Sequence, residues 1–140
     1  MTVHVLVISG SMGSGKTTVL GEASDLLSSR DVAHAAIDLD AISTAGVARH
    51  VSTTVTFGSL AVIYSNVLGA GLDRLLIAEA VDSVATLERL RLAMPEARIV
   101  VCRLIASIPT MQARLRAREP GMLQAQFVAR ASELEQTLDQ

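Results

Sequence analysis

The sequence has very few aromatic residues and almost no net charge. Tryptophan is absent, and one tyrosine and two phenylalanines make up 2% of the 140 residues, so stacking of aromatic side chains on a base or ring is scarcely available. The net charge of −2 and the pI near 5.9 lack the basic balance that is typical of nucleic-acid-binding proteins. We therefore expect no nucleic-acid partner, and any bound phosphate must be held by local groups.

Disulfides, long apolar runs and an export signal are also missing. The single cysteine, Cys102, cannot form a disulfide within the chain, and the apolar run around it predicts a buried, inert thiol in a reducing compartment. No unbroken apolar stretch approaches the roughly eighteen residues that a membrane helix needs. The first nine residues contain neither lysine nor arginine and no cleavage-like site, which favours a first strand over a signal peptide. We expect a soluble, cytoplasmic protein.

The apolar pattern predicts strands that alternate with helices in one domain spanning residues 1–140. Short β-branched apolar runs indicate four strands, and apolar residues at helical spacing lie between them. Ser83 is the expected N-cap of the third helix. The predicted strands are residues 3–9, 33–39, 72–78 and 98–105, and the predicted helices are residues 16–30, 57–68, 83–94, 109–119 and 122–138. Residues 43–56 show no clear period. This order predicts an α/β fold with a mainly parallel sheet.

A glycine-rich turn separates the first predicted strand from the first predicted helix. Its sequence, GSMGSGKT at residues 10–17, matches G-x-x-x-x-G-K-[ST], the P-loop or Walker A pattern, in the strand-to-helix context that this pattern requires. Glycine lets the backbone wrap closely around phosphate oxygens, and the helix N-terminus adds the positive end of its dipole. The predicted nucleotide-binding residues are Gly10, Ser11, Met12, Gly13, Ser14, Gly15, Lys16, Thr17 and Thr18.

Two side chains of this turn have predicted chemical roles. Lys16 would reach the β- and γ-phosphates of ATP and stabilise the charge that develops as the terminal phosphoryl group leaves. The Thr17 hydroxyl would bind Mg²⁺ together with phosphate oxygens. A glycine-rich turn with a solvated lysine is the alternative. The N-K-x-D element of guanine-specific proteins is absent from the sequence, which favours ATP over GTP.

Acidic residues follow the second and third predicted strands, where ligands collect in open α/β sheets. Asp38 and Asp40 are two residues apart, so both would face the same way if the strand continued. We expect Asp38 to orient an acceptor hydroxyl and take its proton, whereas for Asp40 a capping or loop contact is an equal alternative. Glu79 is a candidate Mg²⁺ or acceptor ligand, with a solvated strand-end carboxylate as the alternative. Asp82 is a further candidate.

The predicted helix at residues 109–119 carries a cluster of arginines. Arg114 and Arg118 share one face of this helix, and Arg116 points roughly opposite. Arginines beside such a site could clamp phosphates or stack on a base. A solvated basic face is the alternative, and the same two readings apply to Arg130.

The loop, the Asp38-Leu39-Asp40 segment and the arginine-rich helix resemble the small-molecule kinase branch of P-loop proteins. Adenylylsulfate kinase, gluconate kinase and chloramphenicol phosphotransferase belong to that branch. The phrase AAIDLDAI and the helix leading to RAREPG also resemble uncharacterised actinobacterial ATP-binding proteins related to it. The resemblance implies a P-loop three-layer sandwich with strand order 2-3-1-4, an acceptor-activating carboxylate at Asp38 and a mobile lid around Arg118.

The chain departs from that branch at two places. Adenylylsulfate kinases carry Asp-Gly-Asp, whereas Leu39 replaces the glycine here, which argues against their sulfate-containing substrate. These families usually have a fifth strand after the lid that helps to form the base pocket, but this chain ends at Gln140 within or just past a predicted helix. Either the chain is truncated or the nucleotide pocket is unusually open.

These features predict an ATP- and Mg²⁺-dependent phosphotransferase that acts on a hydroxyl group of an unidentified small molecule. Its predicted catalytic residues are Lys16, Asp38, Arg114 and Arg118, and its predicted metal ligands are Thr17 and Glu79. The alternative is a nucleotide-binding module or slow ATPase that acts as a sensor or partner switch without a dedicated acceptor. A third alternative is a degenerate fold that has lost nucleotide binding and serves only as an oligomerisation scaffold. The intact loop argues against it.

Overall fold

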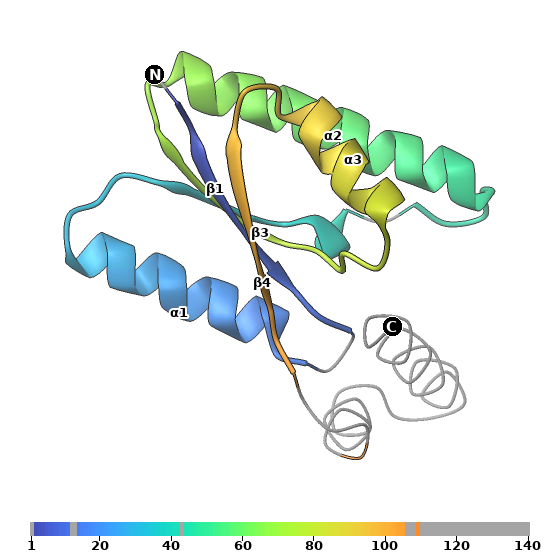
Figure 1. The fold of residues 1–140 in the computed structure, drawn as a ribbon, viewed down its shortest axis with the longest axis horizontal. Coiled ribbons are helices and arrows are strands. Elements are labelled where there is room, and N and C mark those ends of the chain that lie inside the picture. The colour runs from blue at the N-terminus through green and yellow to red at the C-terminus, as the bar shows by residue number, and fades with distance from the viewer. Residues whose placement is uncertain (1, 12–13, 43, 106–108, 110–140) are drawn as a thin grey trace.

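The computed structural model describes residues 2–11, 14–42, 44–105 and 109, and in them strands alternate with helices (Figure 1). The elements are β1 (His4–Ser9), α1 (Lys16–Ser29), β2 (Ala35–Asp38), the 3-10 helix η1 (Leu39–Ala41), α2 (Arg49–Gly69), β3 (Arg74–Ala78), α3 (Val84–Ala93) and β4 (Arg98–Arg103). The four predicted strands and the helices after the first and third strands are therefore confirmed. The predicted helices at 109–119 and 122–138 lie outside the described residues, except for Pro109.

The four strands form one parallel sheet in the order β2-β3-β1-β4, which confirms the predicted fold class and strand order. Ile8 on β1 lies opposite Ala78 on β3 and Cys102 on β4, and Asp38 on β2 also lies opposite Ala78. The carboxyl ends of β1, β2 and β3 consequently meet at one edge of the sheet. In open α/β folds this edge is where ligands bind.

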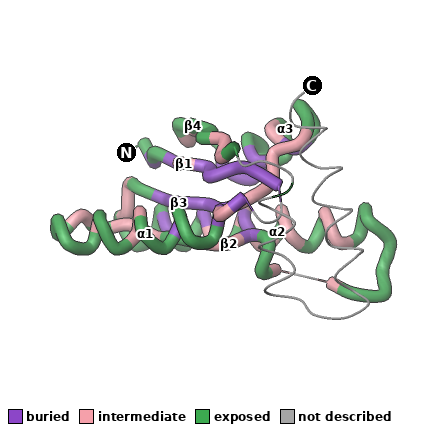
Figure 2. The backbone as a smooth tube through the Cα atoms, turned by 90° about the horizontal axis from the view of Figure 1, so that it is seen from below, coloured by how far each residue is buried: buried purple, intermediate pink, exposed green. Residues whose placement is uncertain are grey.

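Apolar side chains on both faces of the central strands make two cores, one on each side of the sheet. Figure 1 shows α1 on one side of the sheet and α2 with α3 on the other. Val5 and Val7 point into the larger core with α2 and α3, whereas Ile8 packs with Leu20 of α1. This alternation follows from the two-residue period of a strand. Figure 2 shows the result, with β1 and β3 the most buried elements.

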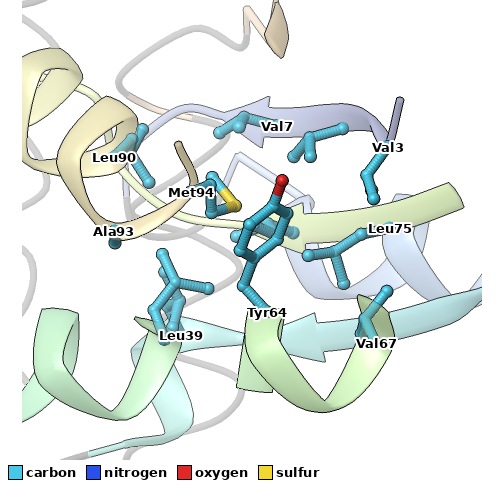
Figure 3. Close-up of a cluster of buried hydrophobic side chains, with 12 residues drawn as sticks. Val3, Val7, Leu39, Tyr64, Val67, Leu75, Leu90, Ala93 and Met94 are labelled. Atoms are coloured by element: carbon cyan, nitrogen blue, oxygen red, sulfur yellow. The ribbon is translucent and has the colours of Figure 1, made fainter. Parts of the chain in front are cut away.

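Helix α2 supplies one wall of the larger core and is longer than its sequence predicts. It begins at Arg49, inside the segment that has no clear period. The sequence does not predict these first turns because they are rich in β-branched residues, which are weak helix formers. Leu60, Tyr64 and Val67 belong to the larger core, and Figure 3 shows Tyr64 and Val67 pointing toward the side chains of the sheet. The Tyr64 hydroxyl donates a hydrogen bond of 2.8 Å to the carbonyl oxygen of Pro95. Tertiary packing thus supports a helix that local propensity does not reveal.

The 21 residues of α2 also meet the length and composition expected of a membrane-crossing helix, with a mean hydropathy of 1.3 over an 18-residue window. It is the one helix within the described residues that does so. Serines, threonines and an asparagine interrupt its apolar residues. Leu60, Tyr64 and Val67 of this helix are buried in the core, but only 17% of the apolar window is buried, and Val51, Val55 and Val62 are exposed.

The prediction of a buried thiol is wrong, because Cys102 is exposed. Cys102 lies opposite Ile8 and therefore faces the side of the sheet on which α1 packs. Helix α1 packs mainly against β1, β2 and β3, whereas β4 pairs with β1 alone among the described strands. An apolar stretch on an edge strand can keep one face open, and sequence does not distinguish an edge strand from a central one.

Candidate functional site

The turn between β1 and α1 has a backbone shape that requires glycine at two positions. Gly10 has φ +154°, and a Cβ built there would lie 2.5 Å from Ser14 Oγ and 3.2 Å from the carbonyl oxygen of Leu104. Gly15, the N-cap residue of α1, has φ 99° in the left-handed region, which residues with a side chain rarely adopt. Met12 and Gly13 lie outside the described residues.

The same turn presents unsatisfied donors at the start of α1. The first amides of a helix have no partner within the helix, and α1 has no side-chain cap and no acidic residue in its first turn. Ser14 Oγ is buried and has no hydrogen-bond partner within the part of the chain that the structure describes. Ser14 N–H, by contrast, donates 3.1 Å to the carbonyl oxygen of Ser11. The residues present therefore fit a phosphate group, whose oxygens would accept from these donors.

Lys16 extends back across the loop instead of into solvent. Its side chain is 6% exposed, and its Nζ donates hydrogen bonds of 2.7 Å to the carbonyl oxygen of Gly10 and 3.1 Å to that of Ser11. The same Nζ lies 3.4 Å from Asp40 Oδ2. The ammonium group is thus held between the loop and the carboxyl end of β2.

Asp38 and Asp40 occupy different positions, because β2 ends at Asp38 and Asp40 belongs to η1. Asp38 Oδ2 accepts a 2.8 Å hydrogen bond from the Thr17 hydroxyl, and its Oδ1 accepts one of 3.0 Å from the Asp40 amide. The capping contact considered for Asp40 is therefore made by Asp38. Asp40 turns toward Lys16 instead, which sequence spacing alone did not predict.

Glu79 follows β3 directly, and its amide donates 3.1 Å to the carbonyl oxygen of Ile8. Burial raises the pKa of the Glu79 carboxyl to about 7, and the charge of Asp40 adds to this rise, while the Ala80 amide and Lys16 lower it. Burial also raises the pKa of Asp40, against the attraction of Lys16. Two carboxyl groups with raised pKa values beside an ammonium group are typical of a functional site.

A cavity of about 620 Å³ opens beside these charged groups. It lies between η1, the first turns of α2, the end of β3 and α3. Its lining residues are Lys16, Asp40, Arg49, Thr53, Phe57, Glu79, Ala80, Asp82, Ser83, Thr86 and Arg89. Neither Asp38 nor Thr17 is among them. The sequence did not identify Arg49 as a site residue, because the start of α2 was not recognised. It offered no signal that Phe57 or Arg89 would line a site.

Several polar groups of the cavity wall already have structural roles. The Thr86 hydroxyl donates 2.8 Å to Asp82 Oδ1, and the Thr86 amide donates 3.2 Å to Ser83 Oγ, which confirms Ser83 as the N-cap of α3. Asp82 therefore helps to hold the N-terminus of α3, because it accepts a hydrogen bond from Thr86 in the first turn. Residues 2–11, 14–42, 44–105 and 109 hold no cluster of three or more His, Cys, Asp or Glu residues that could bind a metal ion. The predicted arginines Arg114, Arg116, Arg118 and Arg130 lie outside the described residues.

No family model matches the sequence, and no curated protein matches it. Solved structures share its fold. A gluconokinase from Sinorhizobium meliloti 1021 has a TM-score of 0.62 and 17% identity over 94% of this chain and 74% of that chain. A sugar kinase from Janibacter sp. HTCC2649 has a TM-score of 0.62 and 21% identity, over 94% of this chain and 78% of that chain.

A third similar structure is a chain of the Pnkp1/Rnl/Hen1 RNA repair complex, with a TM-score of 0.67 and 14% identity. The match covers 99% of this chain but 45% of that chain. At these identities the likeness concerns the fold. The chain has an α/β fold of the P-loop kinase type, with a parallel four-stranded sheet in the order 2-3-1-4.

Proposed function

We propose that this protein is an ATP-dependent phosphotransferase that transfers the γ-phosphoryl group to a hydroxyl group of a small molecule. The observation that carries the proposal is the position of Lys16, whose Nζ lies between a phosphate-binding loop and a cavity lined by Asp40 and Glu79. The names of two similar structures, a gluconokinase and a sugar kinase, support the same class of reaction.

The loop would hold the phosphates of ATP through its amides and the Ser14 hydroxyl. Lys16 would exchange its two carbonyl partners for phosphate oxygens and stabilise the charge that develops on them. Thr17 is the proposed Mg²⁺ ligand, with Glu79 as a second ligand bound directly or through water, and the ion would neutralise charge on the phosphates. Mg²⁺ commonly uses only one or two protein ligands, so the absence of a larger cluster among the described residues fits this role.

Two carboxylates are candidates for the group that takes the acceptor's proton. In the reaction, the acceptor oxygen forms a bond to the γ-phosphorus, the bond from that phosphorus to the ADP oxygen breaks, and the hydroxyl proton moves to a base. Asp38 is the candidate predicted from sequence, but both of its oxygens already accept hydrogen bonds. Asp40 lines the cavity and is 44% exposed there. The geometry favours Asp40 as the base, with Asp38 orienting Thr17.

The remaining elements of the proposal depend on residues outside the described part. Arg114 and Arg118 are proposed to close over the phosphates, as the resemblance to P-loop kinases implies. Residues 1–140 are proposed to act as one domain in the cytoplasm. The cavity favours this enzyme over a nucleotide-binding module, because a sensor or slow ATPase needs no pocket for a second substrate.

The proposal is tested by measuring ADP release by the purified chain with ATP and Mg²⁺. The assay is run with and without a panel of hydroxylated small molecules. We expect at least one compound to stimulate ADP release and to gain a phosphoryl group, detected by mass spectrometry. ATP turnover that no compound stimulates would support the slow ATPase instead, and a failure to bind ATP would overturn both.

A further inference from the structure

We infer that the acceptor is an anionic molecule, a hydroxylated carboxylate or phosphate ester, whose charged group binds between Arg49 and Arg89. This inference rests on the proposed function, because it assigns the substrate class of the same cavity. Arg49 comes from the first turn of α2 and Arg89 from the middle of α3, and both line the cavity that Lys16, Asp40 and Glu79 also line.

Among the described residues, the two arginines are cations without a matching carboxylate. Neither Arg49 nor Arg89 forms an ion pair or a side-chain hydrogen bond with another described residue, whereas Arg91, also on α3, contacts Glu88 at 2.6 Å and Arg74 contacts Asp73 at 3.2 Å. Asp82 is the third acidic residue of the wall, and it accepts a hydrogen bond from the Thr86 hydroxyl. Within the part of the chain that the structure describes, the charges of Arg49 and Arg89 are therefore open to a ligand.

The surroundings of Arg49 add to this positive potential. Helix α2 has no acidic residue in its first turn and no side-chain cap at Ala48, although acidic residues stabilise the positive end of a helix dipole. The dipole disfavours a guanidinium group at that end, and a bound anion would remove this small cost. Guanidinium groups bind carboxylates and phosphates through paired, charge-assisted hydrogen bonds, which gives orientation as well as affinity.

The division of charge across the cavity suggests how the acceptor would lie. Lys16 belongs to the phosphate-binding loop and is assigned to ATP, and Asp40 and Glu79 flank it, so a hydroxyl group is the part of the acceptor that suits this end. The anionic group suits Arg49 and Arg89, and the half-buried Phe57 supplies an apolar surface. Such an arrangement would reject neutral analogues, because the arginines would then lose water without gaining a partner.

Calorimetry on the full chain, with the loop saturated by Mg²⁺ and a nonhydrolysable ATP analogue, tests the inference. The probes are four- to six-carbon sugar alcohols, the sugar acids of the same carbon skeletons and the phosphate monoesters of the same alcohols. We expect binding by the sugar acids or by the phosphate esters, which identifies the anionic group, and at least about tenfold weaker binding by the matching alcohol.

Arg49→Gln and Arg89→Gln should each weaken binding of the preferred anion at least about tenfold. Arg91→Gln is the matched control, because Arg91 is also on α3 but pairs with Glu88 outside the cavity, and it should bind the anion as wild type does. Affinity for the ATP analogue should be unchanged in all three variants. This value also reports the fold of the loop.

Three results would overturn the inference. The first is that no anion binds more tightly than its neutral counterpart, and the second is that the Arg49 and Arg89 variants bind the anion as tightly as wild type does. The third is a loss of ATP-analogue affinity in those variants. The last result would assign the arginines to the nucleotide. A wild-type chain that does not bind the ATP analogue at all would instead contradict the proposed function, so the two failures are distinguishable.

Discussion

Lys16 Nζ lies 3.4 Å from Asp40 Oδ2, and this ion pair joins the loop between β1 and α1 to the cavity. The lysine is 6% exposed and the aspartate 44% exposed, so one partner is fixed while the other reaches solvent. Because Lys16 lowers the pKa of Asp40 against the effect of burial, movement of the ammonium group toward bound phosphates would let that pKa rise. Nucleotide binding would thereby make Asp40 a stronger base.

Lys16→Ala should weaken ATP binding strongly, since the substitution removes the one side-chain cation that the described structure places at the loop. A charge-assisted contact of this kind is worth about 2–3 kcal/mol, so we expect affinity to fall by about thirty- to hundredfold or more. Isothermal titration calorimetry with ATP and Mg²⁺ measures the change. Arg91→Gln, which also removes one positive charge but lies outside the cavity, should bind ATP normally. Unchanged affinity in Lys16→Ala would contradict the assignment of the loop.

Lys16 is also the only lysine in the sequence. An amine-reactive reagent followed by peptide mass spectrometry therefore reports on this side chain and on the chain's N-terminal amine. Bound ATP and Mg²⁺ should slow the labelling of Lys16 severalfold while the N-terminal amine reacts at its usual rate. Equal protection of both amines, or of neither, would count against contact between Lys16 and the nucleotide.

Asp40→Asn and Asp38→Asn should have different effects. If Asp40 is the base, Asp40→Asn lowers the rate of acceptor phosphorylation by about 10²–10⁴-fold, the usual contribution of a general base, with ATP affinity retained. Asp38→Asn keeps a side chain that can still cap η1 but weakens the acceptor of the Thr17 hydroxyl, so its main effect should be on Mg²⁺-dependent ATP binding. Steady-state kinetics and calorimetry separate the two effects. The reverse pattern would restore Asp38 to the role predicted from sequence.

The features of the site that sequence predicts are those that depend on local order along the chain. The loop can be predicted because it requires only a strand, glycines and a helix in succession. Asp38 and Glu79 can be predicted from the rule that the carboxyl ends of parallel strands meet at one edge of the sheet. Arg49 and Arg89 could not be found in this way, because they come together through the packing of α2 and α3. The exposure of Cys102 likewise depends on β4 lying at an edge, which the sequence of β4 does not encode.

The partner of each carboxylate was also beyond sequence reasoning. A continued strand would have turned Asp38 and Asp40 the same way, but the chain enters η1 after Asp38. One residue therefore holds Thr17 and the other Lys16. A change from strand to 3-10 helix within three residues leaves no periodic signal.

Glu79 should make stability depend on pH near neutrality. Its folded-state pKa is raised from 4.5 to about 7, so the folded chain binds its proton more tightly than the unfolded chain does. The resulting stability is present in full below about pH 4.5 and is lost as the pH rises to about 7, by at most about 3 kcal/mol. Urea unfolding across this range should show wild type losing stability relative to Glu79→Gln, which keeps the shape of the side chain without the charge.

The control is Glu22→Gln, at an exposed position of α1, which should show the same change of stability with pH as wild type. A constant difference between wild type and Glu79→Gln at all pH values would contradict the burial argument.

Substitution of two glycines by alanine should have opposite effects. In Gly10→Ala the new Cβ would lie 2.5 Å from Ser14 Oγ at a φ of +154°, so the loop must shift, at a cost of about 1–3 kcal/mol. We expect lower stability in urea unfolding and about tenfold or weaker binding of ATP by calorimetry. Gly21, inside α1, has nothing within 4 Å of its position for a Cβ, so Gly21→Ala should stabilise the chain by about 0.5–1 kcal/mol and leave ATP affinity unchanged. If Gly10→Ala bound ATP as tightly as wild type, the loop would not be closed around the nucleotide in the conformation described, because that conformation has no space for the added methyl group.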